Sequence, residues 1–312
     1  MRPFRLTHST AVLGLLGTAF IWGGTFAAVA FSLRHGLSVG ALLSLRFGIG
    51  SLALAALMLI LRVRPRLPEL KDGLWLGVVL SAIFWLQTDG LRFTTTSKSG
   101  FITGLYVIFT PMAAMIVGDR LRPSHAVGAL MALAGLLMLV YEPGLGLTAW
   151  NRGDTETLGN ALLVGVHIVM TGRFSRRSNG WVLAWTQVTV VAVLALLGAL
   201  LAPAPYGFQG AGALLRHPGV WIALGYLGLL GTTLALWLQS TLQSRVSATE
   251  TAILFSLEPV FAALLAVSGF VPGIRESLGG LQILGAALIF GATLVAELGP
   301  RLLGMRAAEA LD

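Results

Sequence analysis

The segment Ser247–Gly269, SATETAILFSLEPVFAALLAVSG, decides the fold class of this chain. It is an apolar run long enough to cross a bilayer, for which about 20 residues suffice. A carboxylate, Glu258, lies near its middle and is followed at once by Pro259. The segment therefore predicts a membrane-spanning helix that carries an acidic side chain next to a helix-breaking residue.

A second apolar run, Ser99–Gly118, resembles the first in the order of its landmarks. The tripeptide Trp-Leu-Gln precedes both runs, ending at Gln87 and at Gln239. A proline follows each tripeptide, Pro111 in the earlier run and Pro259 in the later one. The recurring order indicates that the chain contains two copies of one unit.

The composition is that of a membrane protein. Charged residues make up 11% of the 312 residues and hydrophobic ones 56%, with a mean hydropathy of +0.84. Soluble domains carry about a quarter charged residues. The net charge of +8 fits basic cytoplasmic loops better than nucleic-acid binding, because no soluble basic domain is present. No cysteine occurs, so disulfides and thiol chemistry are excluded.

Apolar segments separated by charged or Gly/Pro-rich breaks predict an all-α integral membrane protein with ten transmembrane helices. The expected segments are 11–33, 39–61, 73–92, 97–118, 124–141, 157–173, 180–202, 219–241, 247–269 and 277–297. The run that begins at Ala11 is too long for a signal peptide, whose apolar region has roughly 7–15 residues. Gly285 and Gly291, in the last segment, are expected to allow close helix contact.

The distribution of basic residues predicts the orientation. With the N-terminus inside, 14 of the Lys and Arg residues fall in inner segments and six in outer loops. Both termini are then expected to be cytoplasmic. Five helices per unit is an odd number, so the second unit enters the membrane upside down, as in transporters with inverted repeats. The predicted division is 1–10 (N-terminus), 11–141 (first repeat), 142–156 (connecting loop), 157–297 (second repeat) and 298–312 (C-terminal tail).

Six motifs follow one another along the chain: IWGGTF (21–26), LLSLRF (42–47), WLQTDGLRFTTTSKSGFITGLYVIFTP (85–111), HIVMTGRFSRR (167–177), SLEPVFAALLA (256–266) and LGAALIFGATL (284–294). In these motifs the sequence resembles the drug/metabolite transporter superfamily, in its EamA-like ten-helix branch. The likeness covers about residues 11–297. The resemblance implies two five-helix repeats, a central cavity and movement of small metabolites such as amino acids across the cell inner membrane.

Arg46 lies about seven residues into the second segment, roughly 10 Å deep. An arginine at that depth is costly and indicates a role such as binding a substrate carboxylate. Pairing with Asp89 is an alternative, since both residues fall in the outer half of the predicted topology. Snorkelling of the guanidinium to the interface is a third reading.

Three titratable residues are candidates for proton coupling: Glu258, His167 and Asp89. For Glu258 the alternative is a structural carboxyl that stabilises the kink at Pro259, and for His167 a packing role. Asp89 lies near the outer end of its segment and is equally consistent with lining an entrance or with facing water beside Arg92. Glu250 and Lys98 lie near segment starts, where we expect them to be solvated.

Neutral polar and aromatic side chains complete the predicted cavity. Glutamines offer donors and acceptors, and tryptophans offer an apolar wall suited to amphipathic substrates. The candidates are Gln87, Gln187, Gln239, Trp22, Trp85 and Trp237. Pro111 and Pro259 are predicted to break their helices at matching places, and the site is expected between those helices.

These features predict a secondary transporter, not an enzyme, that exports small amino-acid-like or amphipathic metabolites by alternating access. A flippase for lipids or lipid-linked sugars is the alternative, and an intramembrane enzyme a more distant one. The chain has no HExxH pair and no Walker motif, so we expect no catalytic set, metal, cofactor or ATP drive. The expected partners are a small-molecule substrate, the bilayer and a coupling ion or proton, with the protein a monomer or homodimer.

Overall fold

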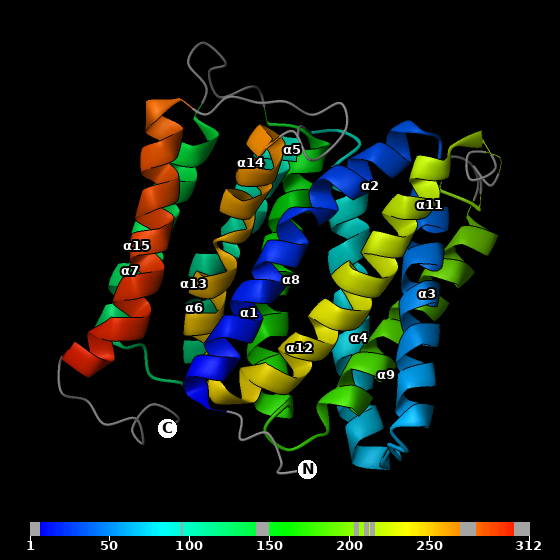
Figure 1. Cartoon of the computed structure of the whole chain (residues 1–312), viewed down its shortest axis with the longest axis horizontal. Coiled ribbons are helices and arrows are strands. Elements are labelled where there is room, and N and C mark those ends of the chain that lie inside the picture. Colours follow the sequence, from blue (N-terminus) through cyan, green and yellow to red (C-terminus); the bar gives the residue numbers. More distant parts are fainter. Residues whose placement is uncertain are drawn as a thin grey trace.

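The computed structural model describes residues 7–94, 96–141, 150–202, 206–208, 212, 216–268 and 279–302. Within these residues every regular element is a helix (Figure 1). The first half of the chain contains α1 (His8–Gly23), α2 (Thr25–Arg34), α3 (Val39–Ile60), α4 (Leu67–Gly90), α5 (Thr96–Gly104), α6 (Tyr106–Ile116) and α7 (Pro123–Val140). The second half contains α8 (Arg152–Phe174), α9 (Gly180–Leu201), α11 (Pro218–Gly225), the π-helix η1 (Tyr226–Leu234), α12 (Ala235–Leu242), the 3₁₀ turn η2 (Gln243–Arg245), α13 (Ala248–Phe255), α14 (Glu258–Ser268) and α15 (Gly280–Leu302).

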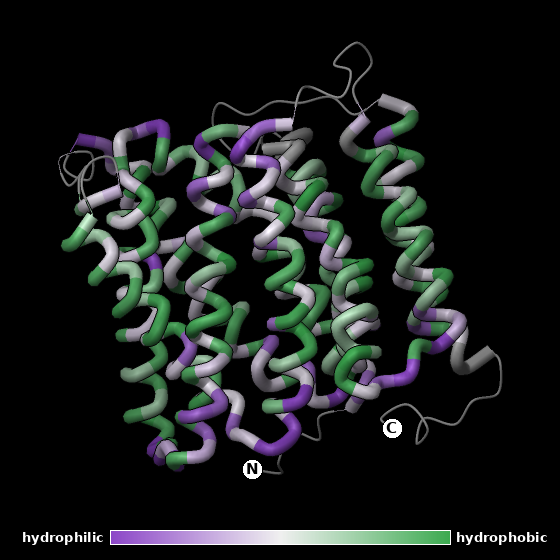
Figure 2. Tube along the Cα trace, turned by 180° about the vertical axis from the view of Figure 1, so that it is seen from behind, coloured by the Kyte–Doolittle hydropathy of each residue, from purple (hydrophilic) through white to green (hydrophobic). Residues whose placement is uncertain are grey.

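Seven helical stretches in the described part of the chain are long and apolar enough to cross a membrane. Four of them join consecutive elements, for example His8–Arg34, which contains α1 and α2. The shorter apolar helix Pro123–Leu139 is a further stretch of this kind. α4 and α8 are outside this set, because buried polar residues such as Asp72 and Asn160 lie among their apolar ones. The tube in Figure 2 accordingly shows hydrophilic residues gathered at the two ends of the molecule and apolar ones between them.

The helices pack into one bundle whose apolar cores lie between elements distant in sequence. α3, α4, α9 and α12 enclose one core, which contains Phe47, Phe84 and Val188. α1, α12 and α13 enclose another, which contains Leu15 and Phe255. α7 and α15 run side by side at one edge of the bundle, and the first residue of α1 and the last of α15 lie at the same end (Figure 1).

Three of the predicted segments are interrupted within the described residues. α1 gives way to α2 at Gly24, α5 to α6 at Leu105, and α13 to α14 at Ser256 and Leu257. The backbone bonds at the second and third breaks tighten to three-residue spacing, from Leu105 N to Ile102 O and from Leu257 N to Leu254 O. This spacing is typical of helix ends, so each break satisfies most of its own polar groups.

The prediction that the helix breaks at Pro111 is corrected by the structure. Pro111 lies inside α6, and the break falls about one and a half turns earlier, at Leu105. A proline ring collides with the carbonyl of the residue four positions before it, here Val107, so the distortion falls on the preceding turn. Pro259 does lie at its break, as the second residue of α14, where its missing N–H costs no hydrogen bond.

Glycine lets α7 and α15 approach closely. A β-carbon at Gly285 would lie 2.6 Å from the carbonyl oxygen of Gly135 and 2.7 Å from the amide nitrogen of Leu139. These neighbours are backbone atoms and cannot swing aside. At Gly291 in the same helix, the nearest such neighbour is the flexible Cε of Met131 at 3.6 Å. Of the two glycines, only Gly285 therefore lies directly against the backbone of α7.

Ion pairs join the helices at both ends of the molecule. At one end the buried carboxylate of Asp89 binds Arg92 and Arg152, each at 2.8 Å. At the other end Asp119 binds Arg173 at 3.1 Å, and both of those side chains are about half exposed. The alternative that Asp89 pairs with Arg46 is therefore wrong, because both oxygens of Asp89 are occupied by other arginines.

The glycine contact predicts a difference between two alanine variants of α15. We expect Gly285→Ala to lower the melting temperature of the detergent-purified protein, because a forced separation of packed helices costs about 1–3 kcal/mol. Gly291→Ala should leave it unchanged or raise it, since alanine stabilises a helix interior by roughly 0.5–1 kcal/mol over glycine. Equal melting temperatures for the two variants would contradict the packing described.

The ion pairs predict a second contrast, between Asp89→Ala and Asp119→Ala. Removing the buried Asp89 leaves Arg92 without its counter-charge and leaves Arg152 paired with Glu156 alone, so the melting temperature should fall clearly. Asp119→Ala removes an exposed pair, which contributes only about 0–1 kcal/mol. The measurement is thermal unfolding at low and at high salt. A loss of stability in Asp119→Ala as large as that in Asp89→Ala would refute the assignment.

Candidate functional site

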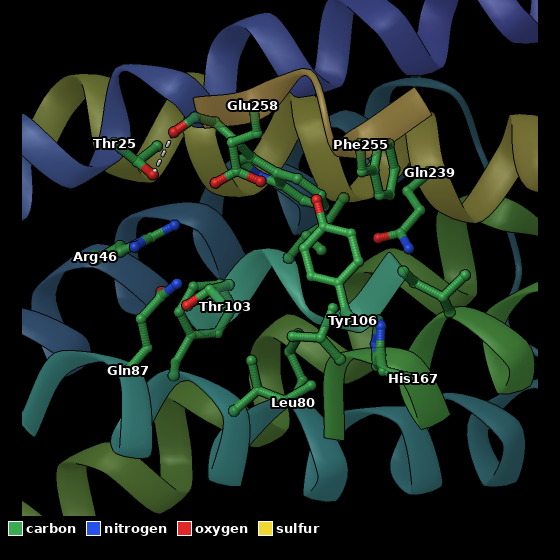
Figure 3. A pocket seen from close by; sticks show the side chains of 16 residues that line it. Thr25, Arg46, Leu80, Gln87, Thr103, Tyr106, His167, Gln239, Phe255 and Glu258 are labelled. Carbon is green, nitrogen blue, oxygen red and sulfur yellow. Dashed lines mark hydrogen bonds between the residues drawn. The ribbon is translucent and has the colours of Figure 1, made fainter. Parts of the chain in front are cut away.

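The three helix breaks converge on one cavity (Figure 3). Each break contributes two lining side chains, three residues apart, on either side of the interruption. The pairs are Trp22 and Thr25 from α1 and α2, Thr103 and Tyr106 from α5 and α6, and Phe255 and Glu258 from α13 and α14. The breaks thus turn side chains from six helical pieces toward a common space.

Arg46 reaches this cavity from α3 and is 1% exposed. Its Nε donates a hydrogen bond to the hydroxyl of Thr232 on the π-helix at 3.0 Å. Its guanidinium carbon lies 4.5 Å from the ring centroid of Phe84 and 5.2 Å from that of Phe47. Stacking on aromatic rings holds a guanidinium without neutralising it. The snorkelling alternative is also wrong, because this group is buried in the protein.

Glu258 enters the cavity from the first residue of α14 and is 9% exposed. A carboxylate at a helix N-terminus is stabilised by the unpaired N–H groups of the first turn. Across the described residues, its carboxylate makes no side-chain hydrogen bond and no ion pair. Figure 3 shows Glu258 and Arg46 pointing into the same space from different helices. The cavity therefore holds a guanidinium and a carboxyl group that are not joined by a salt bridge.

Aromatic rings form much of the wall between these two groups. Trp22 packs edge-on against Phe255 with ring centroids 5.0 Å apart, and its indole N–H donates to the carbonyl of Gly231 at 3.0 Å. The hydroxyl of Tyr106 is buried and has no hydrogen-bond partner among the described residues. Such a hydroxyl is costly unless a ligand or water binds it. The cavity therefore offers apolar surface together with an unused donor and acceptor.

His167 lines the cavity and is held from behind by a chain of hydrogen bonds. Its Nε2 lies 3.0 Å from Oε1 of Gln187, whose Nε2 donates to the hydroxyl of Ser240 at 2.9 Å. Gln187 is thus a support for the imidazole and does not line the cavity. Gln239 does line it and donates to Oε1 of Gln243 at 3.1 Å. Both amide chains tie α12 to neighbouring elements.

Half of the predicted site residues lie in the cavity wall. Those that line it are Trp22, Arg46, Gln87, His167, Gln239 and Glu258, and those that do not are Trp85, Asp89, Pro111, Gln187, Trp237 and Pro259. Trp85 stacks on Tyr206 with ring centroids 6.2 Å apart, and Trp237 packs on Trp181 at 4.6 Å. These two tryptophans pack between helices. Most tryptophans in a helical bundle pack in this way, and the sequence alone does not distinguish them from tryptophans that line a cavity.

Sequence reasoning missed Thr25, Thr103, Tyr106 and Phe255. None of them is charged, and each residue type is common in membrane helices. The usable signal in the sequence is a small residue near each break: Gly23 and Gly24, Gly104, and Ser256 two residues before Glu258. The solvated position predicted for Glu250 is also wrong. Its carboxylate is buried and lies 3.0 Å from Nε2 of His8.

His8, Glu250 and Glu297 offer three ligand atoms within 4.8 Å of one another. Nδ1 of His8 lies 3.5 Å from Glu297, so each ring nitrogen already faces one carboxylate. That arrangement suits a protonated imidazole between two acids, tying α1 to α13 and α15. Lys98 was the other residue expected to be solvated, and its side chain lies outside the described residues.

The sequence GLSVG at Gly36–Gly40 matches the GxSxG pattern of serine hydrolases. Its serine, Ser38, is the N-cap of α3 and accepts a hydrogen bond from the amide of Ala41 at 3.1 Å. The hydroxyl donates in turn to the carbonyl of Gly207. Ser38 therefore caps a helix, and in a helical chain it is not at the strand-to-helix turn from which a hydrolase presents its nucleophile.

Comparisons with known proteins agree with this architecture. An uncharacterized transporter of Archaeoglobus fulgidus is 31% identical over 289 residues, covering 92% of this chain and 86% of the relative. The aromatic amino acid exporter YddG of Ancylobacter novellus is 28% identical over 216 residues, covering 67% and 70% of the two chains. The uncharacterized transporter YcxC of Bacillus subtilis is 24% identical, covering 90% and 91%.

A solved crystal structure, titled only as that of a protein, superposes with a TM-score of 0.72 at 24% identity. The match covers 95% of this chain and 99% of that one, so the two share a fold over nearly their whole length. The sequence profile of the EamA-like transporter family matches residues 9–141 and again residues 152–297. This chain, an all-helical protein with several candidate membrane spans, therefore belongs to the EamA-like transporter family.

Proposed function

We propose that the chain is a secondary transporter that exports amino-acid-like zwitterions with an apolar, preferably aromatic, side chain. The observation that carries this proposal is the placement of Arg46 and Glu258 in one cavity without a salt bridge between them. Uncompensated charges in a buried site are costly. A zwitterion compensates both, with its carboxylate at Arg46 and its ammonium group at Glu258.

The lining of the cavity supports the same cargo. Its wall combines a few polar groups with aromatic and aliphatic side chains, as small-molecule sites usually do. Trp22, Phe84, Tyr106 and Phe255 give the apolar wall that a bulky side chain would contact. The relative YddG is named an aromatic amino acid exporter, which favours both this class of cargo and the outward direction.

Alternating access is the mechanism that the arrangement of the breaks supports. We propose ten spanning segments in two inverted five-helix repeats, 11–141 and 157–297. The broken helices α5–α6 and α13–α14 are the fourth segments of their repeats, and they run in opposite directions in Figure 1. Matched interruptions at one site allow two gates of similar construction to open in turn. In this scheme both termini are cytoplasmic and the membrane is the inner one.

The decisive experiment is counterflow in proteoliposomes with three compounds of the same ring and nearly the same length. Phenylalanine carries both charges, 3-phenylpropionate lacks the ammonium group, and phenethylamine lacks the carboxylate. We expect only phenylalanine to exchange rapidly.

Arg46→Lys should lower the exchange of phenylalanine at least about tenfold, since lysine cannot replace a bidentate, stacked guanidinium. Glu258→Gln should abolish the preference for phenylalanine over 3-phenylpropionate. Glu156→Gln, outside the cavity, is the matched control.

Running the assay at pH 5.5 and 7.5 tests proton coupling by Glu258. Loss of the pH dependence in Glu258→Gln, with transport retained, identifies Glu258 as the proton carrier. An unchanged pH dependence leaves His167 as the candidate in the cavity wall.

Equal exchange of all three compounds would refute the two-charge site. Movement of a fluorescent phospholipid, with no movement of the three solutes, would favour the flippase alternative instead.

A further inference from the structure

We propose that Tyr106 and Gln239 form a polar subsite of the central cavity that selects cargo with a hydroxyl group on its aromatic ring. Tyrosine would then bind better than phenylalanine. This inference rests on the proposed function and adds a preference within that class of cargo. Two polar groups in the cavity wall carry it, because neither has a partner that explains its position.

The hydroxyl of Tyr106 is the first of these groups. Tyr106 is the first residue of α6, directly after the break at Leu105, and it is 3% exposed. Its hydroxyl oxygen is buried and has no hydrogen-bond partner among the described residues. Buried polar atoms without a partner are rare because they are costly. A ligand group that hydrogen-bonds to this hydroxyl removes that cost when it binds.

The amide oxygen of Gln239 is the second group, and a neighbouring amide sets its direction. Nε2 of Gln243 donates to the carbonyl of Ile168 at 2.6 Å, so the oxygen of Gln243 is left as the acceptor. Nε2 of Gln239 donates to that oxygen at 3.1 Å. Gln239 therefore turns its own oxygen to the cavity, where it accepts no side-chain hydrogen bond within the described part of the chain.

His167 lines the same cavity but does not use this acceptor. The nitrogen of Gln187 donates to Ser240, so the oxygen of Gln187 accepts the N–H of the imidazole Nε2 at 3.0 Å. The other ring nitrogen, Nδ1, faces the hydroxyl of Thr171 at 3.5 Å. Both ring nitrogens thus have a partner away from Gln239, and the acceptor stays open to a ligand.

The positions of the charged groups direct the ring of the cargo to this subsite. Figure 3 shows Arg46 and Gln239 on opposite sides of the cavity, with Glu258 and the hydroxyl of Tyr106 between them. A zwitterion held at Arg46 and Glu258 would extend its side chain toward Gln239. Phe255 lies on that side and offers an apolar surface to the body of the ring.

A phenol hydroxyl is the group that satisfies both members of the subsite. It donates its proton to the oxygen of Gln239 and accepts a hydrogen bond from the hydroxyl of Tyr106. An indole N–H donates only, and the ring of phenylalanine does neither. A site that hydrogen-bonds a hydroxyl discriminates against the analogue that lacks it, because its own polar groups are then left unpaired. The expected order of affinity is tyrosine, then tryptophan, then phenylalanine.

The test is counterflow of labelled phenylalanine in proteoliposomes, in competition with unlabelled phenylalanine, tyrosine or 4-fluorophenylalanine. Fluorine fills the position of the hydroxyl but donates no hydrogen bond. We expect tyrosine to compete at about tenfold lower concentration than either of the other two, as one to two hydrogen bonds allow.

Tyr106→Phe removes the hydroxyl alone and should lower the preference for tyrosine at least about threefold. The exchange of phenylalanine should be retained, and the melting temperature should be unchanged or higher, because the deleted hydroxyl has no partner in the empty cavity. A merely structural role of Tyr106 would not change the ratio between two cargoes. Gln239→Met, which removes the acceptor, should lower the same ratio.

The matched control is Tyr141→Phe, which deletes the same atom from an exposed side chain at the end of α7, outside the cavity. It should keep the full preference for tyrosine. If phenylalanine exchanges but tyrosine and 4-fluorophenylalanine compete equally, the inference is overturned and the proposed function stands. The same holds if Tyr106→Phe keeps the preference. If no aromatic amino acid exchanges, the proposed function and the inference are both overturned.

Discussion

A helix in lipid must satisfy its own backbone, and this constraint governs the centre of the molecule. A break in such a helix is stable only where protein or a polar cavity surrounds the backbone N–H and C=O groups that lose their helical hydrogen bonds. The breaks between α1 and α2, α5 and α6, and α13 and α14 all lie beside one cavity. Each contributes a side chain to its wall, namely Trp22, Tyr106 and Glu258. The breaks therefore do two things together. They open space between packed helices, and they turn polar side chains into that space.

The charged members of the site were predictable because charge in an apolar segment has few explanations. Arg46, Glu258 and His167 stood out from the sequence, and all three line the cavity. Asp89 stood out equally but lies in an ion-pair cluster at one end of the molecule. Its partner Arg152 is 63 residues away in the chain, across a connection whose path no local pattern specifies. Partners of this kind are set by tertiary packing.

The uncharged members were not predictable for a different reason. Thr103 and Tyr106 belong to residue types that any membrane helix tolerates, so only the position of the break distinguishes them. Pro111 indicated that a break exists but not where it falls, because its ring disturbs the turn before it. Glycine contacts show the same limit. Gly285 and Gly291 are equivalent in sequence terms, and only the neighbouring backbone of α7 separates them.

The π-helix Tyr226–Leu234 stores an extra residue in the segment that faces Arg46. Two neighbouring residues in it, Thr232 and Gly231, accept one hydrogen bond each, from Arg46 and from Trp22 respectively. Rewinding that turn to an α-helix would release the stored residue and rotate everything beyond it by about 100°. Both hydrogen bonds would then be lost together. The hydrogen bonds of the site and the rotation of α12 about its own axis are therefore coupled through this one turn.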